Sequence, residues 1–170
     1  LEKLPDSILI IGGGYIACEF ACIFNNLGIK VTQLLRSNNL LNGFDFDLSQ
    51  SLKESMINSG IELILNDELS NIYKKENNFD FEFKSGQIIN KEKFLFAIGR
   101  EPNLEFLNIK EFDLKMNGKF IDINEFNQTS LPNIYAIGDV IDKPNLTPVA
   151  IEQGRVFADS FYGNLKRSIN

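Results

Sequence analysis

The stretch SILIIGGGYIA, residues 7–17, decides the fold of this 170-residue chain. Ile8 to Ile11 form an apolar run, which is typical of a strand buried on both faces of a parallel sheet. Three glycines end this run, and residues 15–27 then place apolar side chains at helical spacing up to Gly28, a typical helix cap. Residues 30–35 predict a second strand. A strand, a glycine turn, a helix and a strand in this order form one βαβ unit.

The same pattern continues along the first hundred residues. Residues 45–59 predict a second helix with Asp45 near its start, and residues 61–65 predict another buried strand. Aromatic and charged residues alternate over residues 79–83 before a turn, which predicts an antiparallel meander with one solvated face. A buried strand is expected over residues 93–98. The predicted fold class is therefore α/β, a Rossmann-like three-layer domain with a parallel sheet and an antiparallel β-meander.

The pattern changes after Pro102, where we place the domain boundary. We expect a first domain over residues 1–102, a second segment over residues 103–165 and a tail over residues 166–170. The second segment should contain a buried strand at residues 134–137. It should end in a helix with Thr147 as the N-cap and Pro148 at the first helical position, running to about Tyr162.

Composition excludes several classes of function. The chain has no histidine, which rules out Ser-His-Asp and Cys-His hydrolases and most zinc sites, so no metal is expected. Its net charge of −6 argues against a nucleic acid partner. No stretch has the ~20 continuous apolar residues of a membrane span, and none resembles a signal peptide. Two cysteines are too few for a disulfide scaffold, so the expected location is the reducing cytoplasm.

Gly12, Gly14 and Ala17 satisfy the G-x-G-x-x-G/A pattern of dinucleotide-binding turns. Gly12 would form the tight turn, Gly14 would let a pyrophosphate approach the helix N-terminus, and Ala17 would let the helix pack closely on the sheet. Arg36 follows the second strand, where NAD-binding folds carry an acidic residue. Since arginine can bind a phosphate with two hydrogen bonds, NADPH is the favoured nucleotide. The alternative is a solvated arginine at a strand end.

Cys18 and Cys22 lie four residues apart in the first predicted helix. This spacing holds their Cβ atoms about 5–6 Å apart, whereas a disulfide needs about 3.5–4.5 Å. The two cysteines therefore cannot form the redox pair without distorting the helix, and we interpret them as packing residues.

Five segments resemble, in the same order, the flavin-dependent pyridine nucleotide-disulfide oxidoreductases, and they are most similar to the glutathione reductases among them. The resemblance implies NADPH and FAD as cofactors, glutathione disulfide as the substrate, and a homodimer formed through a C-terminal domain. It also implies that residues 1–102 bind NADPH and that residues 103–165 are the second segment of an FAD domain. The five segments are GGGYIACEFA, LLRSNNLLNGFD, FAIGREPN, SLPNIYAIGDV and LTPVAIEQGR.

The resemblance implies roles for two residues near the nicotinamide. Tyr15 resembles the tyrosine that covers the flavin and moves aside when nicotinamide enters, and Glu19 resembles a glutamate that pairs with a lysine of the flavin domain. Their spacing places both on one helix face; without the resemblance, Tyr15 reads as a packing residue and Glu19 as a surface charge. Asn42 stands where the family has a second NADP-binding arginine, so the 2′-phosphate would depend mainly on Arg36 and neighbouring amide or hydroxyl groups.

Other residues match family positions near the flavin. Gly138 and Asp139 resemble the pair whose carboxylate accepts a hydrogen bond from the FAD ribityl chain. Thr147 resembles a threonine at the flavin pyrimidine edge, where a helix N-terminus can stabilise negative charge. Gly99 and Arg100 belong to a turn that lies near the cofactors in the family.

The chain begins with leucine and lacks both the family's redox disulfide and its C-terminal histidine and glutamate pair. We therefore expect part of a longer enzyme, which would not reduce glutathione disulfide by itself. One alternative is a relative of lipoamide dehydrogenase or mercuric reductase, although Arg36 and Tyr15 count against it. Another is a stand-alone nucleotide-binding or redox-sensing module, and a trypanothione or large thioredoxin reductase is also compatible with this segment.

Overall fold

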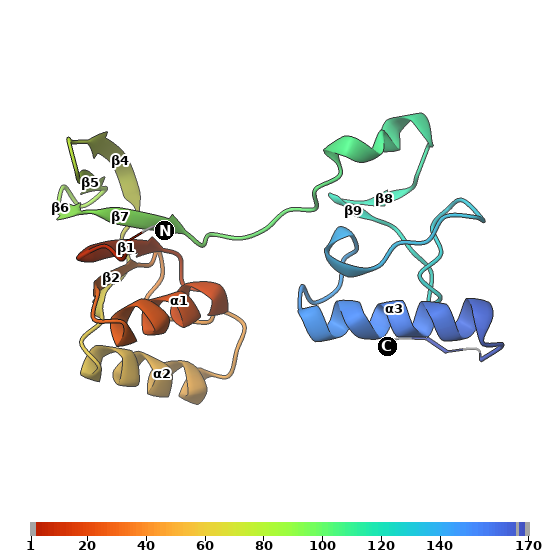
Figure 1. The fold of residues 1–170 in the computed structure, drawn as a ribbon, viewed down its shortest axis with the longest axis horizontal. Coiled ribbons are helices and arrows are strands. Elements are labelled where there is room, and N and C mark those ends of the chain that lie inside the picture. Colours follow the sequence, from red (N-terminus) through yellow and green to blue (C-terminus); the bar gives the residue numbers. More distant parts are fainter. Residues whose placement is uncertain (1–2, 166, 169–170) are drawn as a thin grey trace. The chain divides into compact units, whose positions relative to one another are not determined.

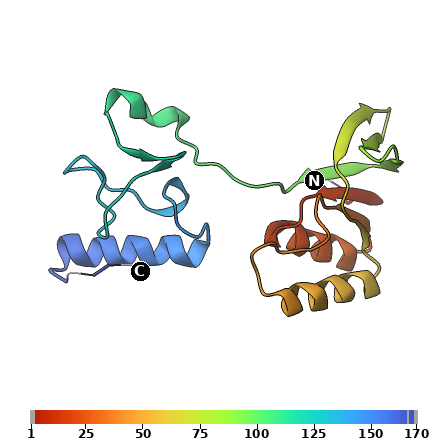
Figure 2. The ribbon, with the colours of Figure 1, turned by 180° about the vertical axis from the view of Figure 1, so that it is seen from behind.

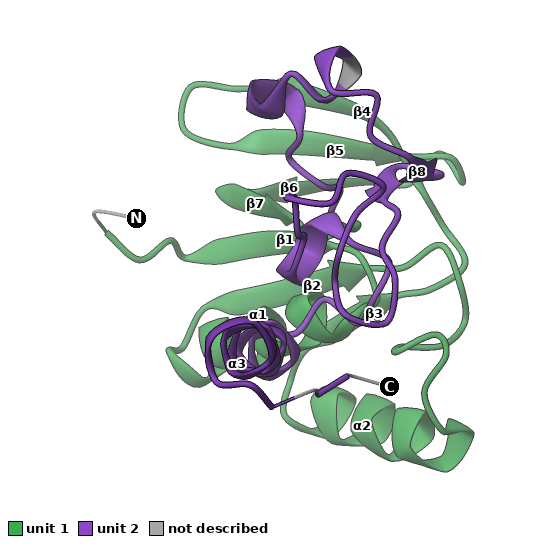
Figure 3. Ribbon diagram, turned by 90° about the vertical axis from the view of Figure 1, so that its right-hand side faces the viewer, with its two compact units in different colours: residues 1–99 green, residues 100–170 purple. Residues whose placement is uncertain are grey.

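A computed structural model describes residues 3–165 and 167–168. The chain divides into two compact units, unit 1 (Leu1–Gly99) and unit 2 (Arg100–Asn170), which Figure 3 shows in green and purple. The boundary expected from the sequence lies slightly later, at Pro102. Residues 166, 169 and 170 of the expected tail lie outside the described residues.

Unit 1 is built on a parallel sheet of four strands in the order β3-β2-β1-β7. The strands are β1 (Ser7–Ile11), β2 (Lys30–Leu34), β3 (Glu62–Ile64) and β7 (Lys93–Phe96). The predicted apolar runs form the first three of these strands, and β1 lies inside the sheet because its residues are apolar on both faces.

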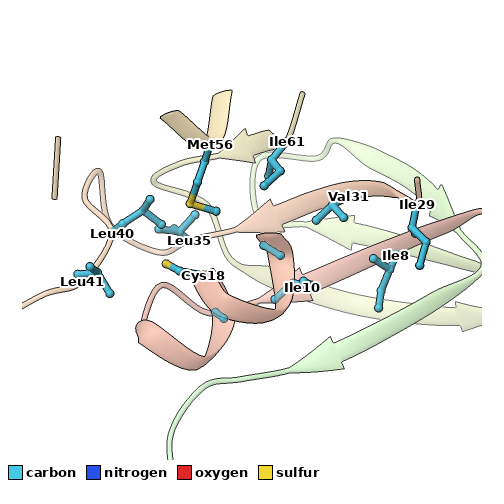
Figure 4. Packing of buried hydrophobic residues seen from close by; sticks show 12 residues of the cluster. Ile8, Ile10, Cys18, Ile29, Val31, Leu35, Leu40, Leu41, Met56 and Ile61 are labelled. Carbon is cyan, nitrogen blue, oxygen red and sulfur yellow. The ribbon is translucent and has the colours of Figure 1, made fainter. Parts of the chain in front are cut away.

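Two helices, α1 (Tyr15–Asn26) and α2 (Phe46–Asn58), cover one face of this sheet (Figure 1). Helix α2 begins after Asp45, whose side chain accepts a hydrogen bond from the Leu48 amide, as a capping residue does. Figure 4 shows the apolar cluster between helices and sheet, in which Met56 from α2 approaches Cys18 and Leu35. The predicted helices at residues 15–27 and 45–59 are confirmed.

An antiparallel sheet, β4 (Leu69–Lys74), β5 (Phe79–Phe83) and β6 (Ile88–Lys91), forms the third layer of unit 1. Its apolar face packs against the opposite side of the parallel sheet, where Phe81 and Phe83 join Leu9 in a second buried cluster. The layers can be followed from behind in Figure 2. The alternation of phenylalanines and charges therefore predicted the meander correctly, and the three-layer α/β fold is confirmed.

Strand β7 differs from the prediction of a strand buried over residues 93–98. It ends at Phe96, and the side chains of Phe96 and Ile98 are 49% and 71% exposed. The reason is the place of β7 at the edge of the parallel sheet, where it has one neighbouring strand. An apolar run predicts a strand but does not reveal whether that strand lies at the centre or at the edge.

In its described residues, unit 2 contains a two-stranded sheet, β8 (Met116–Asn117) with β9 (Phe120–Ile121), and one long helix, α3 (Thr147–Tyr162). Three short 3₁₀ turns occur at Glu105–Leu107, Ile109–Glu111 and Gly138–Val140. The strand predicted at residues 134–137 is wrong, because Tyr135 forms only an isolated bridge with Gln128. The run instead pairs briefly with residues 127–129, through hydrogen bonds from the Thr129 amide to the Ile134 carbonyl and from the Ala136 amide to the Asn127 carbonyl. Ala136 is buried and Ile137 is exposed.

The end of α3 at Tyr162 agrees with the prediction, but its start differs by one residue. Leu146 is the N-cap and Thr147 is already helical, so Pro148 stands at the second helical position. Proline fits there because the amides of the first turn have no partner within the helix. Among the described residues, no helix is long and apolar enough to cross a membrane, and no group of three or more potential ligands could hold a metal ion.

Candidate functional site

The glycine turn after β1 brings two strand ends very close together. Gly12 has a φ of +134°, and its amide donates a hydrogen bond to the Leu34 carbonyl at 2.9 Å. A Cβ atom at this position would lie 2.2 Å from the Ala97 carbonyl oxygen, beyond the end of β7. Both the backbone angle and the close approach therefore require glycine.

The start of α1 leaves open space in front of its first turn. Gly14 is the N-cap, it offers no side-chain hydrogen bond, and a Cβ atom built on it would meet no other atom within 4 Å. No acidic residue lies in the first turn, and Ala17 is fully buried against the sheet. The first amides of a helix have no acceptors within it and carry a partial positive charge, so this end is suited to an anion.

Gln33, near the end of β2, supports the glycine turn, although no sequence motif points to it. Its side chain is fully buried, and Nε2 donates a hydrogen bond to the Gly12 carbonyl at 2.8 Å. The same nitrogen lies 3.9 Å from Sγ of Cys18, whose thiol pKa is raised chiefly by burial. Oε1 of Gln33 is buried without a partner among the described residues. The available signal was a pair of polar residues, Thr32 and Gln33, inside a strand expected to be buried.

The loop after β2 carries Arg36 and touches the glycine turn. The Leu41 amide donates a hydrogen bond to the Gly13 carbonyl at 2.7 Å, which joins the two segments. Arg36 is exposed near this junction, and Ser37 donates to the Asn39 carbonyl at 2.9 Å. Asn42 Nδ2 lies 3.5 Å from the Ser37 hydroxyl oxygen. A cation, a hydroxyl and an amide thus belong to one loop next to the start of α1.

Three polar side chains of helix α2 form hydrogen bonds to this loop. They follow one another along one side of the helix and bond successive loop residues in the reverse order. The hydrogen bonds run from Ser49 Oγ to the Leu40 carbonyl (2.7 Å), from Gln50 Nε2 to Asn39 Oδ1 (3.1 Å) and from Lys53 Nζ to the Asn38 carbonyl (3.0 Å). The loop conformation is therefore set by side chains that no motif identifies.

The Glu68 carboxylate, in the segment after β3, lies close enough to Arg36 for their charges to interact. The Glu68 carboxylate forms an ion pair with Lys84 at 2.6 Å, and this bond together with the nearby charges of Lys84 and Arg36 lowers its pKa. Asp67 accepts a hydrogen bond from the Ser85 hydroxyl at 2.5 Å, which lowers the pKa of Asp67. Lys84 is thus already paired with a carboxylate at this edge of the sheet.

Tyr15 and Glu19 lie on the first two turns of α1. Tyr15 is partly buried and packs against the cluster between helices and sheet, while Glu19 is exposed one turn later. Gly99 closes unit 1 with an exposed backbone at φ +134°. Within unit 1, the structure brings Gly12, Gly14 and the loop of Arg36 together at the carboxyl ends of β1 and β2.

In unit 2, Arg100 links the turn at Gly138–Val140 to the segment before α3. Its Nη2 donates a hydrogen bond to the Asn145 carbonyl at 2.7 Å, and its Nε lies 4.0 Å from Oδ2 of Asp139. Gly138 has a φ of +74°, and its amide donates to Oε1 of the buried Gln153 at 2.6 Å. Arg100 and Asp139, predicted separately, are therefore neighbours.

The N-terminus of α3 lies at the end of the segment that Arg100 holds. Thr147 is the first helical residue, no side chain caps the helix, and its first turn has no acidic residue. Like the start of α1, this end presents helix amides that suit a negative charge. Asp139 remains half exposed on the adjoining turn, with 51% of its side chain accessible.

Comparison with known proteins agrees with this geometry. Residues 1–154 match the pyridine nucleotide-disulphide oxidoreductase family. A glutathione reductase of Burkholderia cepacia is 42% identical over 94% of this chain and 36% of its own length, and a soluble pyridine nucleotide transhydrogenase of Photorhabdus laumondii is 37% identical over 94% and 35%. The HOCl-induced flavoprotein disulfide reductase RclA of Escherichia coli superposes with a TM-score of 0.91 at 30% identity, covering 99% of this chain and 39% of RclA. The chain thus spans little more than a third of the length of these relatives. With its family match and its three-layer glycine-turn domain, the chain belongs to the pyridine nucleotide-disulphide oxidoreductase family.

Proposed function

We propose that unit 1 is the NADPH-binding domain of a flavoprotein disulfide reductase, and that the longer protein reduces glutathione disulfide. The observation that carries this proposal is the junction of the open α1 N-terminus with the Arg36 loop, joined by the Leu41 to Gly13 hydrogen bond. A pyrophosphate suits the first element and a 2′-phosphate the second. When bound, NADPH supplies a hydride.

Different residues of unit 1 would bind different parts of NADPH. Gly14 leaves room for the pyrophosphate at the helix amides, and Gly12 keeps the turn tight enough to place those amides. Arg36 would bind the 2′-phosphate, with the Ser37 hydroxyl and the Asn42 amide as its neutral neighbours. Tyr15 and Glu19 would line the nicotinamide end, and Ala17 lets α1 pack closely on the sheet.

For unit 2 we propose a contribution to an FAD site. Gly138 and Asp139 would receive the ribityl chain, and the start of α3 at Thr147 would face negative charge on the flavin ring. The Arg100 guanidinium would orient both segments, since it bonds the Asn145 carbonyl and approaches the Asp139 carboxylate. When bound, FAD supplies the redox centre of the reaction.

Titration calorimetry of the 170-residue chain tests the nucleotide assignment. We expect NADPH to bind about tenfold more tightly than NADH, because a charge-assisted pair at the 2′-phosphate is lost with NADH. Arg36→Met should strongly reduce this preference and leave NADH binding unchanged. Lys74→Met removes the same charge from an exposed site on β4 and should keep the preference. Equal affinities in the wild-type chain, or tighter NADH binding, would overturn the assignment.

The disulfide substrate is tested on the longer protein. The relatives named above include a glutathione reductase and a transhydrogenase, so the two assays are NADPH oxidation by glutathione disulfide and hydride transfer between pyridine nucleotides. We expect the first activity, and finding only the second would contradict the proposed substrate. We also propose a cytoplasmic homodimer, which sedimentation and cell fractionation of the longer protein would check.

A further inference from the structure

Helix α2 brings a positive charge to the loop that follows Arg36. The Lys53 ammonium donates to the Asn38 carbonyl at 3.0 Å and lies 3.5 Å from Oδ1 of the same residue. Both acceptors are uncharged, so neither neutralises the ammonium. In the described part of the chain, no carboxylate lies within ion-pair distance of Lys53. Its full charge is therefore presented at Asn38, two residues after Arg36.

The other cations near this loop, Lys84 and Arg36, both interact with the Glu68 carboxylate. Lys84 is held by the Glu68 carboxylate at 2.6 Å, so its charge is balanced before any ligand arrives. Arg36 is itself close enough to Glu68 to help lower the pKa of that carboxyl group. Position 42, in the same loop, is a neutral asparagine. Lys53 therefore brings to the loop of Arg36 a second positive charge that no carboxylate of the described residues balances.

We propose that Lys53 is a specificity-determining residue of the nucleotide site, which supplies the second positive charge for a 2′-phosphate. This inference rests on the proposed function, namely that unit 1 prefers NADPH. A phosphate monoester carries a charge of about −1.5 to −2 at neutral pH, which one guanidinium does not balance. An ammonium has three N–H donors, and two acceptors of Asn38 leave one donor for a phosphate oxygen.

The position of Lys53 fits this role because α2 already fixes the loop. Ser49 and Gln50, one turn earlier, bond the neighbouring residues Leu40 and Asn39 through neutral groups. Those two bonds set the loop conformation without adding charge. Lys53 bonds the loop from the same side of α2 but also adds a positive charge. A variant that keeps a hydrogen-bond donor and loses the charge therefore separates the electrostatic contribution of Lys53 from its effect on the loop conformation.

The test compares 2′,5′-ADP with 5′-AMP, which differ only by the 2′-phosphate, in titrations of the 170-residue chain. Lys53→Gln keeps an N–H donor for Asn38 and should weaken 2′,5′-ADP about fivefold, as the loss of a solvent-accessible charge pair does. It should leave 5′-AMP within about twofold of the wild type, since the loop is retained. Lys53→Arg should restore 2′,5′-ADP binding, and Lys74→Gln, which removes a remote lysine on β4, should change neither ligand.

Three outcomes would overturn the inference, and they are distinguishable. If Lys53→Gln weakens both ligands equally, Lys53 only positions the loop. If it weakens neither while the wild-type chain prefers 2′,5′-ADP, then Arg36 recognises the phosphate alone and the proposed function stands without Lys53. If the wild-type chain binds the two ligands equally, the proposed NADPH preference fails, and the role of Lys53 fails with it.

Discussion

The two units of the chain reach a folded state by different means. In unit 1, a parallel sheet is covered on both faces, so that Leu9 and Ile10 point to opposite layers and are both fully buried. In unit 2, the buried members of the apolar cluster are Ile121, Ala136 and Ile141, with partly buried side chains around them, and much of the chain is held by turns and isolated hydrogen bonds. Each added layer of secondary structure buries more apolar surface, so the three-layered unit 1 has a larger core than unit 2.

The difference also appears on the surface of unit 2. A single helix and a two-stranded sheet cannot cover all its large side chains, and Phe106 and Tyr162 are 85% and 78% exposed. Unit 1 has two buried clusters, whereas unit 2 has one small cluster and exposes large aromatic side chains. We therefore expect unit 1 to be the more stable of the two, and the following predictions test this comparison.

The largest effect is expected from Gly12→Ala in unit 1. Its Cβ atom would collide with the Ala97 carbonyl oxygen at an unfavourable φ, so we expect a loss of about 5 kcal/mol of unfolding free energy for unit 1. Circular dichroism during urea unfolding measures it. Gly14→Ala is the matched control, because its Cβ meets no atom and its φ of −80° suits alanine. That control should fold normally but bind NADPH less tightly, and a stable Gly12→Ala variant would contradict the close approach.

Truncating a buried side chain should destabilise unit 1 more than unit 2. Phe81 is fully buried between the layers of unit 1, so Phe81→Ala should cost about 4 kcal/mol there. Ile141 is equally buried in the small cluster of unit 2, where collapse around the gap should limit the cost of Ile141→Ala to about 2 kcal/mol. Hydrogen exchange followed by mass spectrometry reports each unit separately. The comparison fails if each variant lowers protection equally in both units.

Acid should loosen the antiparallel layer of unit 1. The Ser85 hydroxyl lowers the pKa of Asp67, and the Asn90 amide lowers the pKa of Asp80. Because the folded carboxyl groups bind protons less readily than the unfolded ones, their contribution is complete above about pH 5 and is lost as the pH falls below about 4. The thermal midpoint should fall by a few degrees over this range. Asp67→Asn should flatten the profile, and an unchanged midpoint down to pH 3 would disprove the contribution.

The smallest effect concerns the reactivity of the two thiols, both of which lie in α1 of unit 1. Cys18 is 4% exposed, and burial raises the pKa of its thiol, whereas Cys22 is partly exposed. We expect a thiol reagent at pH 8 to modify Cys22 first and to reach Cys18 only when unit 1 opens. Cys22→Ala isolates the slow reaction. Equal modification rates at Cys18 and Cys22 would show that Cys18 is not protected by the packing of α1 against the parallel sheet.

Much of unit 1 follows from sequence patterns. The apolar runs, the glycine turn and the alternating phenylalanines predict β1, α1, β2, α2 and the meander, because each pattern reflects a local period that the backbone must adopt. The run at residues 134–137 shows the limit of this reasoning. It has the composition of a strand, yet in the described part of unit 2 its backbone pairs only over a short stretch, centred on the bridge between Tyr135 and Gln128. A strand needs partners, and partners are not encoded locally.

The candidate site divides in the same way. The sequence by itself predicted Gly12, Gly14 and Arg36 as site residues, since a tight turn, an open helix start and a cation proposed to bind a phosphate each require particular residue types at a fixed spacing. Only the tertiary structure placed Gln33 under the glycine turn and Lys53 against the Arg36 loop. These contacts join residues far apart in the chain, and a hydrogen bond between distant side chains depends on how layers pack, which no local period contains.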